Sequence, residues 1–497
     1  MIHHFLDAQS NRQYDILLIL KENAKPIKIE TISEKLNVSL ATIKQDLSLI
    51  EIKWGHLLSL SIIDSQKVEI KIKNNSLFQQ IVGELITESV PLKWLTLMFF
   101  EPYKTLTEYA DKLHVSRSTL YRTQIILEDA FETLPIHIRQ RQTCFFLEGD
   151  TEDDLRKFFA AFLLESFIFP GAKVPYPDIF PKIATVITSC IFSESEIDDD
   201  QQFYFFQFLY YVSLFREYHG FANESKEFAQ PLEEVTKASV SSIRFYFPTL
   251  KQEQFQQIHE GIYAHIHGWK DVEERDRVEL TAFRFSKMLR EKTAVQLNDK
   301  QQEFLVRLVK QIYLTEKIST TPSSVFFDRF YYFSTTVEKS NTSLFQILNA
   351  MYDCLSEEIG LDPQLHRHSV IYWLCVEIPS LLFYIPELSI LIISDLGKNH
   401  GYFAARMIKN ILNYDELKHL NFTIASLTDY ATMNTDDFDL MIINNTQIQH
   451  PTLPIFYIDD CPQEIELYRF KKYLNRIVEQ KKTCKIFAKK HFGFFSK

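Results

Sequence analysis

Several residue types and motifs are scarce in this sequence, and each absence argues against a class of protein. Glycine occurs 11 times in 497 residues, well below the ~7% of average usage, so a fold rich in tight turns is not expected. The six cysteines form no C-x-x-C pair, which argues against a zinc ribbon or a redox motif. No apolar run approaches the ~18 residues of a membrane span, and the N-terminus has no signal-peptide pattern.

Signature motifs of the common catalytic folds are also missing. The sequence holds no Walker loop, no G-x-G-x-x-G, no H-E-x-x-H and no G-x-S-x-G. We therefore expect a protein that is not an enzyme, carries no cofactor and contacts no membrane. Cysteines without a pairing pattern favour a reduced, cytoplasmic location.

Aromatic and apolar residues are abundant. The chain has 42 Phe and 23 Tyr, and 46% of its residues are hydrophobic, which is ample for folded cores. Because the chain is too long for one core, we expect three to five domains. Few glycines and many aromatics favour a mainly α multidomain protein.

One motif occurs twice near the N-terminus. Residues 35–43 and 112–120 both read K-L-x-V-S-x-x-T-[IL], and the copies lie 77 residues apart. In each copy a short amphipathic helix precedes the motif, and a second helix begins after Ser39 or Ser116. Serine is a preferred N-cap because its oxygen accepts a hydrogen bond from the first turn. This order predicts two helix-turn-helix units, each with a recognition helix.

Alternating apolar and polar residues follow each copy, at 57–72 and 136–147. Period-two alternation predicts a strand pair, which makes each unit a winged helix. Structural helical hairpins carry similar patterns, but two copies with wings favour DNA binding. Outward positions of recognition helices and wings supply base and phosphate contacts. The predicted DNA-binding residues are Ser39, Thr42, Lys44, Gln45, Lys71 and Lys73 in the first copy, and Ser116, Arg117, Ser118, Thr119, Tyr121, Arg122, Arg139 and Arg141 in the second.

The net charge of −11 is unevenly distributed. Residues 1–150 hold 17 Lys and Arg and 19 Asp and Glu. Residues 151–468 hold 27 cationic and 45 acidic residues, and residues 469–497 hold 10 cationic and 1 acidic residue. A near-neutral DNA-binding region depends on local cationic clusters for its phosphate contacts. We therefore expect modest affinity per protomer, with dimerisation adding the rest.

The doubled motif resembles the Mga/AtxA family of global virulence regulators in Gram-positive bacteria. The resemblance includes Leu120-Tyr121-Arg122 and, further on, Gly149-Asp150 followed by Leu155-Arg156-Lys157-Phe158. It implies two winged helix-turn-helix domains, two helical phosphotransferase-regulation (PRD-like) domains, and a C-terminal domain like the EIIB component of sugar phosphotransferase systems. The implied ranges are 1–75, 76–150 (Mga-type), 151–295, 296–387 and 388–497, the last with a basic tail.

Helical apolar spacing at 154–169, 201–218 and 276–291 supports the helical middle of the chain. In the resembled family, histidine phosphorylation regulates such domains, and phosphocarrier proteins are the implied partners. A surface or hydrogen-bonded histidine without a signalling role is the plainer interpretation of each candidate. The H-x-H pairs at 265–267 and 366–368 do not predict a metal site, because i and i+2 point apart on a helix. The phosphorylation candidates are His219, His259, His265, His366 and His368.

After residue 386 short apolar runs alternate with helices, which predicts a small parallel α/β sheet. Strands are expected at 388–394, 421–426, 438–444 and 454–458, and helices at 404–412 and 464–478. The loop 393–401 lacks the cysteine that carries phosphate in EIIB domains. The resemblance then implies a dimerisation or sensing module.

These patterns together predict a DNA-binding transcription regulator that dimerises through its C-terminal domain and responds to sugar-transport phosphorylation. Its DNA partner would be double-stranded promoter DNA. Two alternatives stay open: a phosphotransferase signalling or protein-interaction component without DNA binding, and an RNA-binding antiterminator. The second ranks lowest, because such proteins begin with a β-rich domain.

Overall fold

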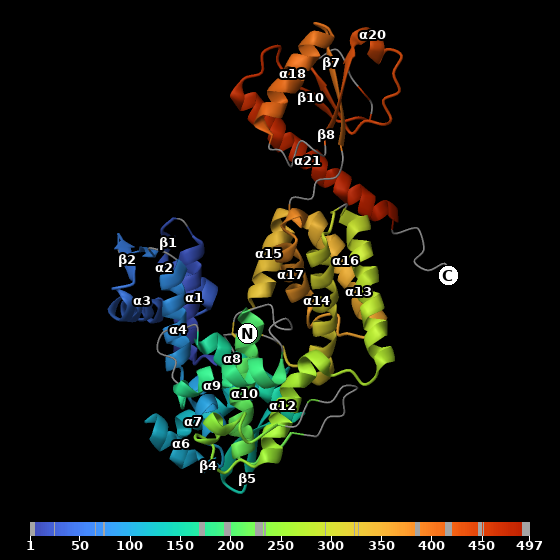
Figure 1. The fold of residues 1–497 in the computed structure, drawn as a ribbon. Coiled ribbons are helices and arrows are strands. Elements are labelled where there is room, and N and C mark those ends of the chain that lie inside the picture. The colour runs from blue at the N-terminus through green and yellow to red at the C-terminus, as the bar shows by residue number, and fades with distance from the viewer. Residues whose placement is uncertain are drawn as a thin grey trace. The chain divides into compact units, whose positions relative to one another are not determined.

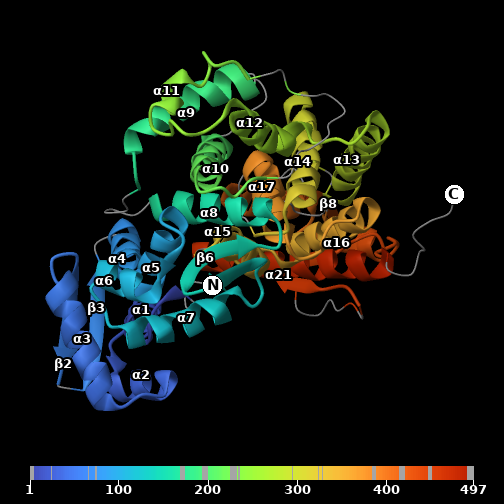
Figure 2. The same cartoon turned by 90° about the horizontal axis from the view of Figure 1, so that it is seen from below.

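The computed structural model is mostly helical, with small sheets in three places (Figure 1). Its two compact units are Met1–Leu280 with Arg307–Arg329, and Thr281–Val306 with Phe330–Lys497. The helices of the first unit appear from a second direction in Figure 2. The structure describes residues 5–23, 25–64, 66–72, 75–167, 174–192, 200–223, 232, 235–293, 295–322, 324–326, 328–382, 388–412, 420–445, 450 and 452–489.

The first winged helix, which we call the first head, follows the predicted order. Its three-stranded antiparallel sheet has the order β1-β3-β2. Buried Ile43, Leu47 and Trp54 from the second motif helix fill its core with Ile32 and Val68. Its elements are α1 (Ala8–Glu22), β1 (Ile27–Lys28), α2 (Ile29–Leu36), α3 (Leu40–Trp54), β2 (Leu58–Ile63) and β3 (Lys67–Ile72).

The second winged helix, which we call the second head, repeats this arrangement with the sheet order β4-β6-β5. A helix, α4 (Asn75–Glu88), precedes it and packs on the first head, where Glu84 accepts a 2.8 Å hydrogen bond from the Trp54 indole. The predicted helices and strand pairs of both heads are confirmed. The elements of the second head are α5 (Val90–Phe100), β4 (Lys104–Thr105), α6 (Leu106–Leu113), α7 (Arg117–Phe131), β5 (Ile136–Arg141) and β6 (Cys144–Gly149).

A helical region completes the first unit. Its central helix, α10, packs against α8 and α12, and its residues Tyr210, Tyr211 and Leu214 have no exposed surface. The predicted helix at 154–169 begins earlier, because the Thr151 hydroxyl accepts from the Asp154 amide at 3.2 Å. Its last two residues lie outside the described part of the chain. The elements are α8 (Glu152–Phe167), η2 (Pro177–Ile179), α9 (Phe180–Val186), η3 (Ile187–Ile191), α10 (Asp200–Tyr218), α11 (Ser241–Arg244) and α12 (Gln252–His267).

Two long helices, α13 (Val272–Thr293) and α14 (Asp299–Ile318), contribute residues to both units. In the second unit they are followed by α15 (Arg329–Ser340), α16 (Thr342–Ile359), α17 (Arg367–Glu377) and η4 (Pro379–Leu381). The structure divides into two units, whereas the family resemblance implies five domains. The boundaries of those five domains therefore stay predictions. Within the described residues, no helix combines the length and apolarity needed to cross a membrane.

The C-terminal region is a four-stranded, all-parallel sheet in the order β10-β9-β7-β8, as predicted. Helices α18 and α21 cover one face, where Ile390, Ile392 and Phe470 are buried together. Residues from the loops and from α20 cover the other face around Leu391 and Ile393. The elements are β7 (Leu388–Ser394), α18 (Lys398–Ile411), β8 (Leu420–Ser426), α20 (Leu427–Tyr430), β9 (Leu440–Ile443), β10 (Ile455–Tyr457) and α21 (Glu464–Lys489).

Two helix predictions in this region were too short. Helix α18 begins at Lys398 rather than at residue 404, because Gly397 caps it with a φ of 94°. Gly401 looks like a helix breaker in the sequence, yet a Cβ there would lie 2.7 Å from Ile424 Cγ2. Any larger residue would therefore force a shift of Ile424 where α18 crosses β8. Helix α21 continues to Lys489, beyond the predicted end at residue 478.

Candidate nucleic-acid interface

Three residues connect the two motif helices in each head, and the first of them is left-handed. Asn37 has a φ of 51° and His114 a φ of 55°, values that Asn and His adopt more readily than most residues. The following serines cap the second helix as predicted: Ser39 Oγ accepts from the Thr42 amide at 3.2 Å, and Ser116 Oγ from the Thr119 amide at 3.1 Å. The turn and cap fix where each recognition helix begins.

The capping hydroxyls are also occupied locally. Ser116 Oγ lies 2.8 Å from Thr119 Oγ1 and 3.0 Å from Ser118 Oγ, and Ser39 Oγ lies 2.8 Å from Thr42 Oγ1. These predicted contact residues therefore position the helix N-terminus. The exposed hydroxyls of Ser39, Ser116 and Ser118 at these helix N-termini remain suited to a phosphate oxygen.

The outer face of α7 is cationic. Arg117, Arg122 and Tyr121 are exposed, and Tyr121 leaves 62% of its surface accessible. Arg122 Nε donates to the Ser118 carbonyl at 3.3 Å, which holds its guanidinium along the helix. No hydrogen bond or ion pair within the described residues occupies the Arg117 guanidinium. An arginine guanidinium can donate two parallel hydrogen bonds to the O6 and N7 atoms of guanine.

The outer face of α3 is weaker in charge. Lys44 and Gln45 are exposed as predicted, and Leu40 is 41% exposed. Asp46 points inward, where its carboxylate pairs with Arg12 of α1 at 2.9 Å. The first head thus uses a partly buried ion pair for folding, and Lys44 is the cation that the described outer face of its recognition helix presents.

The wings offer fewer free cations than the sequence indicates. Lys71 pairs with Glu69 at 3.1 Å, and Arg139 pairs with Glu148 at 2.8 Å on the second wing. Arg141 is exposed at the end of β5. Lys73 lies outside the described residues. Such exposed pairs are weak, so a DNA phosphate can compete for each cation.

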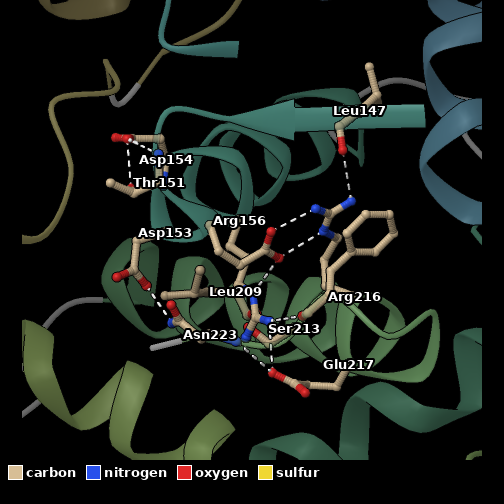
Figure 3. A network of polar contacts seen from close by, with 12 residues as sticks. Leu147, Thr151, Asp153, Asp154, Arg156, Leu209, Ser213, Arg216, Glu217 and Asn223 are labelled. Carbon is tan, nitrogen blue, oxygen red and sulfur yellow. Dashed lines mark hydrogen bonds and ion pairs between the residues drawn. The ribbon is translucent and has the colours of Figure 1, made fainter. Parts of the chain in front are cut away.

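A buried ionic network fixes the second wing to the helical region (Figure 3). Arg216 of α10 donates to Glu152 through Nε at 2.7 Å and Nη2 at 2.6 Å, and through Nη1 to the Leu147 carbonyl of β6 at 3.2 Å. Arg156 of α8 donates to Glu217 at 2.8 Å. Each arginine is only 2% exposed. Removing one partner of such a network leaves a buried charge unpaired, which is costly.

Aromatic contacts extend this attachment. Phe221, just after α10, stacks on Tyr103 with ring centroids 5.5 Å apart and lies beside Phe146 of β6. His219 Nε2 donates to the Phe100 carbonyl at the end of α5, at 2.9 Å. The sequence did not predict these contacts, because their partners lie 60 or more residues apart.

The five histidine candidates differ in accessibility. His219 is the candidate in contact with the second head, and burial lowers its pKa. His259 has no exposed surface: its Nε2 lies 2.8 Å from the Tyr210 hydroxyl, and burial lowers its pKa to about 3. His265 and His366 are buried, while His368 is half-buried with Nδ1 at 2.6 Å from Ser334 Oγ.

The loop after β7 holds carboxylate and amide groups. Asp395 accepts hydrogen bonds from the side-chain amides of Asn444 at 2.6 Å and Asn445 at 3.1 Å. No cysteine occurs between residues 393 and 401. A phosphocysteine therefore cannot form here, and the Asp395 carboxylate would oppose a bound phosphate.

Two family models match the N-terminal part of the chain. One, described as an HTH domain, matches residues 12–66, and the other, described as the Mga helix-turn-helix domain, matches residues 74–163. The chain is a DNA-binding transcription regulator whose second head is similar to the Mga helix-turn-helix domain. The Mga match continues past the second wing into α8, the helix that carries Glu152 and Arg156 of the buried network. No curated protein matches the chain.

Proposed function

We propose that the chain is an Mga-type regulator that binds promoter DNA through the second head, with α7 in the major groove and the wing on the adjacent backbone. The cationic outer face of α7 carries this proposal. Arg117, at the first position of α7, is assigned to a guanine edge, and Arg122 to a phosphate. The first head adds contacts that depend more on DNA shape, because the outer face of α3 carries a single cation.

A salt titration of binding to duplex DNA tests this proposal. For Arg122→Ala, the slope of log affinity against log salt should decrease by about 1, with similar weakening on promoter and random DNA. For Arg117→Ala, preference for promoter over random DNA should fall by about ten- to a hundredfold. Leu40→Ala with Gln45→Ala, at the equivalent positions of α3, is the matched control and should have a smaller effect.

Two outcomes would redirect the proposal. Unchanged binding in both arginine variants removes α7 from the interface. Absence of binding by wild-type protein at low salt makes the heads protein-interaction modules, the alternative that the sequence left open. Preference for a hairpin RNA over duplex DNA would favour an antiterminator.

Regulation by histidine phosphorylation is the finer part of the proposal, with His219 as the site. It is half-buried, and its Nε2 meets the second head at the Phe100 carbonyl. Phosphorylation of Nε2 would replace its N–H donor by negatively charged oxygens. These oxygens would face the Phe100 carbonyl, which disfavours the contact between His219 and the second head. His219→Glu should change promoter affinity more than His219→Gln, and equal affinities would argue against this site.

Dimerisation through the C-terminal α/β region, as an EIIB-like module, completes the proposal. Its helices expose large apolar side chains, namely Tyr402 at 58%, Ile465 at 65% and Tyr468 at 71%. Exposed apolar residues of this size are frequent at protein interfaces. Sedimentation of Tyr402→Ser with Tyr468→Ser should give a monomer where the wild type gives a dimer. A wild-type monomer would argue against the assembly.

A further inference from the structure

An exposed isoleucine occupies the middle of the outer face of α7. The inner face of this helix is defined by the fully buried residues Leu120 and Leu127. At 3.6 residues per turn, Ile125 projects nearly opposite them. It is 55% exposed. Burial against the second head therefore does not explain an isoleucine here.

The surroundings of Ile125 combine apolar surface with positive charge. Tyr121 lies one turn before it on the same face, and Arg117 lies one turn before Tyr121. Arg122 flanks this strip from the side. A cationic border attracts a phosphate backbone, while the apolar centre suits an uncharged group. Both properties match a major groove with a thymine methyl group on its floor.

The residues that follow Ile125 on α7 are poorly suited to contact DNA. Glu128 and Asp129 are exposed in the next turn of α7, and their carboxylates repel phosphates. The Gln124 amide donates to Glu128 at 2.8 Å. The groove-facing part of α7 thus ends near Ile125.

We infer that Ile125 reads a thymine in the major groove through van der Waals contact with its C5 methyl group. This inference rests on the proposed function, in which α7 enters the groove. Eight residues of helix separate Arg117 from Ile125, which is ~12 Å of rise. At ~3.4 Å per base pair, the thymine then lies about three to four base pairs from the guanine read by Arg117.

The first head lacks this feature. Its equivalent residue, at the same offset of 77 as the repeated motif, is the exposed Ser48. The exposed isoleucine of α3 is Ile52, 78% accessible and one turn further along the helix. Thymine-methyl readout is therefore a property of the second head, and Ile52 provides a matched control.

Uracil in place of thymine tests the inference, because it pairs identically with adenine and lacks only the methyl group. Duplexes bound by the full-length wild-type protein are selected from a random library, then prepared with thymine or with uracil. The wild type should bind thymine DNA about fourfold more tightly for each contacted methyl, the value of one buried methyl group. Ile125→Ala should bring this ratio close to one, whereas Ile52→Ala should leave it unchanged.

Each outcome decides a different point. Equal wild-type affinity for thymine and uracil DNA, or an unchanged ratio in Ile125→Ala, overturns the inference and leaves the proposed function intact. Failure of the wild type to bind any duplex at low salt overturns the proposed function itself. Replacing thymines by uracil one at a time then places the contacted base relative to the guanine whose substitution is tolerated by Arg117→Ala.

Discussion

A buried lysine in α8 is the strongest test of the electrostatics in this fold. Lys157 is 1% exposed, and its Nζ donates to the Ser319 carbonyl at 2.9 Å. Burial lowers the pKa of Lys157 from 10.5 to about 7, opposed by the negative charges of Asp154 and Glu316. Asp154 is itself held by the Ser319 hydroxyl at 2.7 Å. The side chain therefore joins α8 to the residue that follows α14.

The sign of the resulting pH dependence follows from the direction of the shift. Between pH 7 and 10.5 the folded state holds Lys157 neutral while the unfolded chain protonates it. Unfolding takes up a proton in this window, so the free energy of unfolding rises with pH. The slope approaches ~1.4 kcal/mol per pH unit above the folded pKa, so this group alone adds roughly 2 kcal/mol between pH 7 and 9.

Lys157→Met removes the titrating group while keeping a side chain of similar length. It leaves the Ser319 carbonyl without its donor, which costs about 1–3 kcal/mol at every pH. The stability of the variant minus that of the wild type should therefore decrease by roughly 2 kcal/mol from pH 7 to 9. The measurement is the opening free energy of α8 amides by hydrogen exchange, with exposed Lys237→Met as the matched control.

A difference that stays constant over this pH range would refute the argument. It would mean that Lys157 keeps an ordinary pKa in the folded protein, through water access or a stronger field from Asp154. A change of the same size in Lys237→Met would assign the effect to general charge.

Three further predictions concern other parts of the chain. Gly401→Ala should destabilise the C-terminal sheet by about 1–3 kcal/mol, because the added Cβ would lie 2.7 Å from Ile424 Cγ2; an unchanged thermal midpoint would contradict it. Because burial lowers the pKa of His259 from 6.5 to about 3, its contribution to stability should fall by roughly 2 kcal/mol from pH 6.5 to 4.5, and His259→Gln should lack this loss in acid unfolding. Maleimide at neutral pH should label exposed Cys461 well before Cys375, whose pKa burial raises to about 12; mass spectrometry of peptides would reveal any reversed order.

Much of both heads was predictable because their signals are local. The start of α7 follows from the Ser116 cap and its helical apolar spacing, and the wing follows from period-two alternation. The short strands β1 and β4 were not predicted, because two residues carry no period. The capping box of α6, in which Thr105 and Glu108 exchange hydrogen bonds, was also missed, although its T-x-x-E spacing is visible in the sequence.

The sequence predicted the DNA-contact residues less completely than it predicted the fold of the heads. Arg117 and Arg122 were correctly assigned to the outer face of α7, since helical spacing determines which side a residue faces. Spacing alone does not reveal which charges are already paired, as for Arg139 with Glu148. That depends on the neighbouring strand and hence on register. Ile125 was not among the predicted contact residues, because apolar residues of an amphipathic helix more often face the core.

The sequence by itself determined the two helix-turn-helix motifs, the wings and the presence of a small parallel sheet at the C-terminal end, because caps, periodicity and turn residues act over a few neighbours. Only the tertiary structure decided that Arg216 joins Leu147 and Glu152, and that Lys157 reaches Ser319. These partners are 64 to 162 residues apart, and the chain brings them together by burying apolar surface. Burial then lowers the pKa of Lys157, since the pKa of a side chain depends on how much water the folded chain leaves around it.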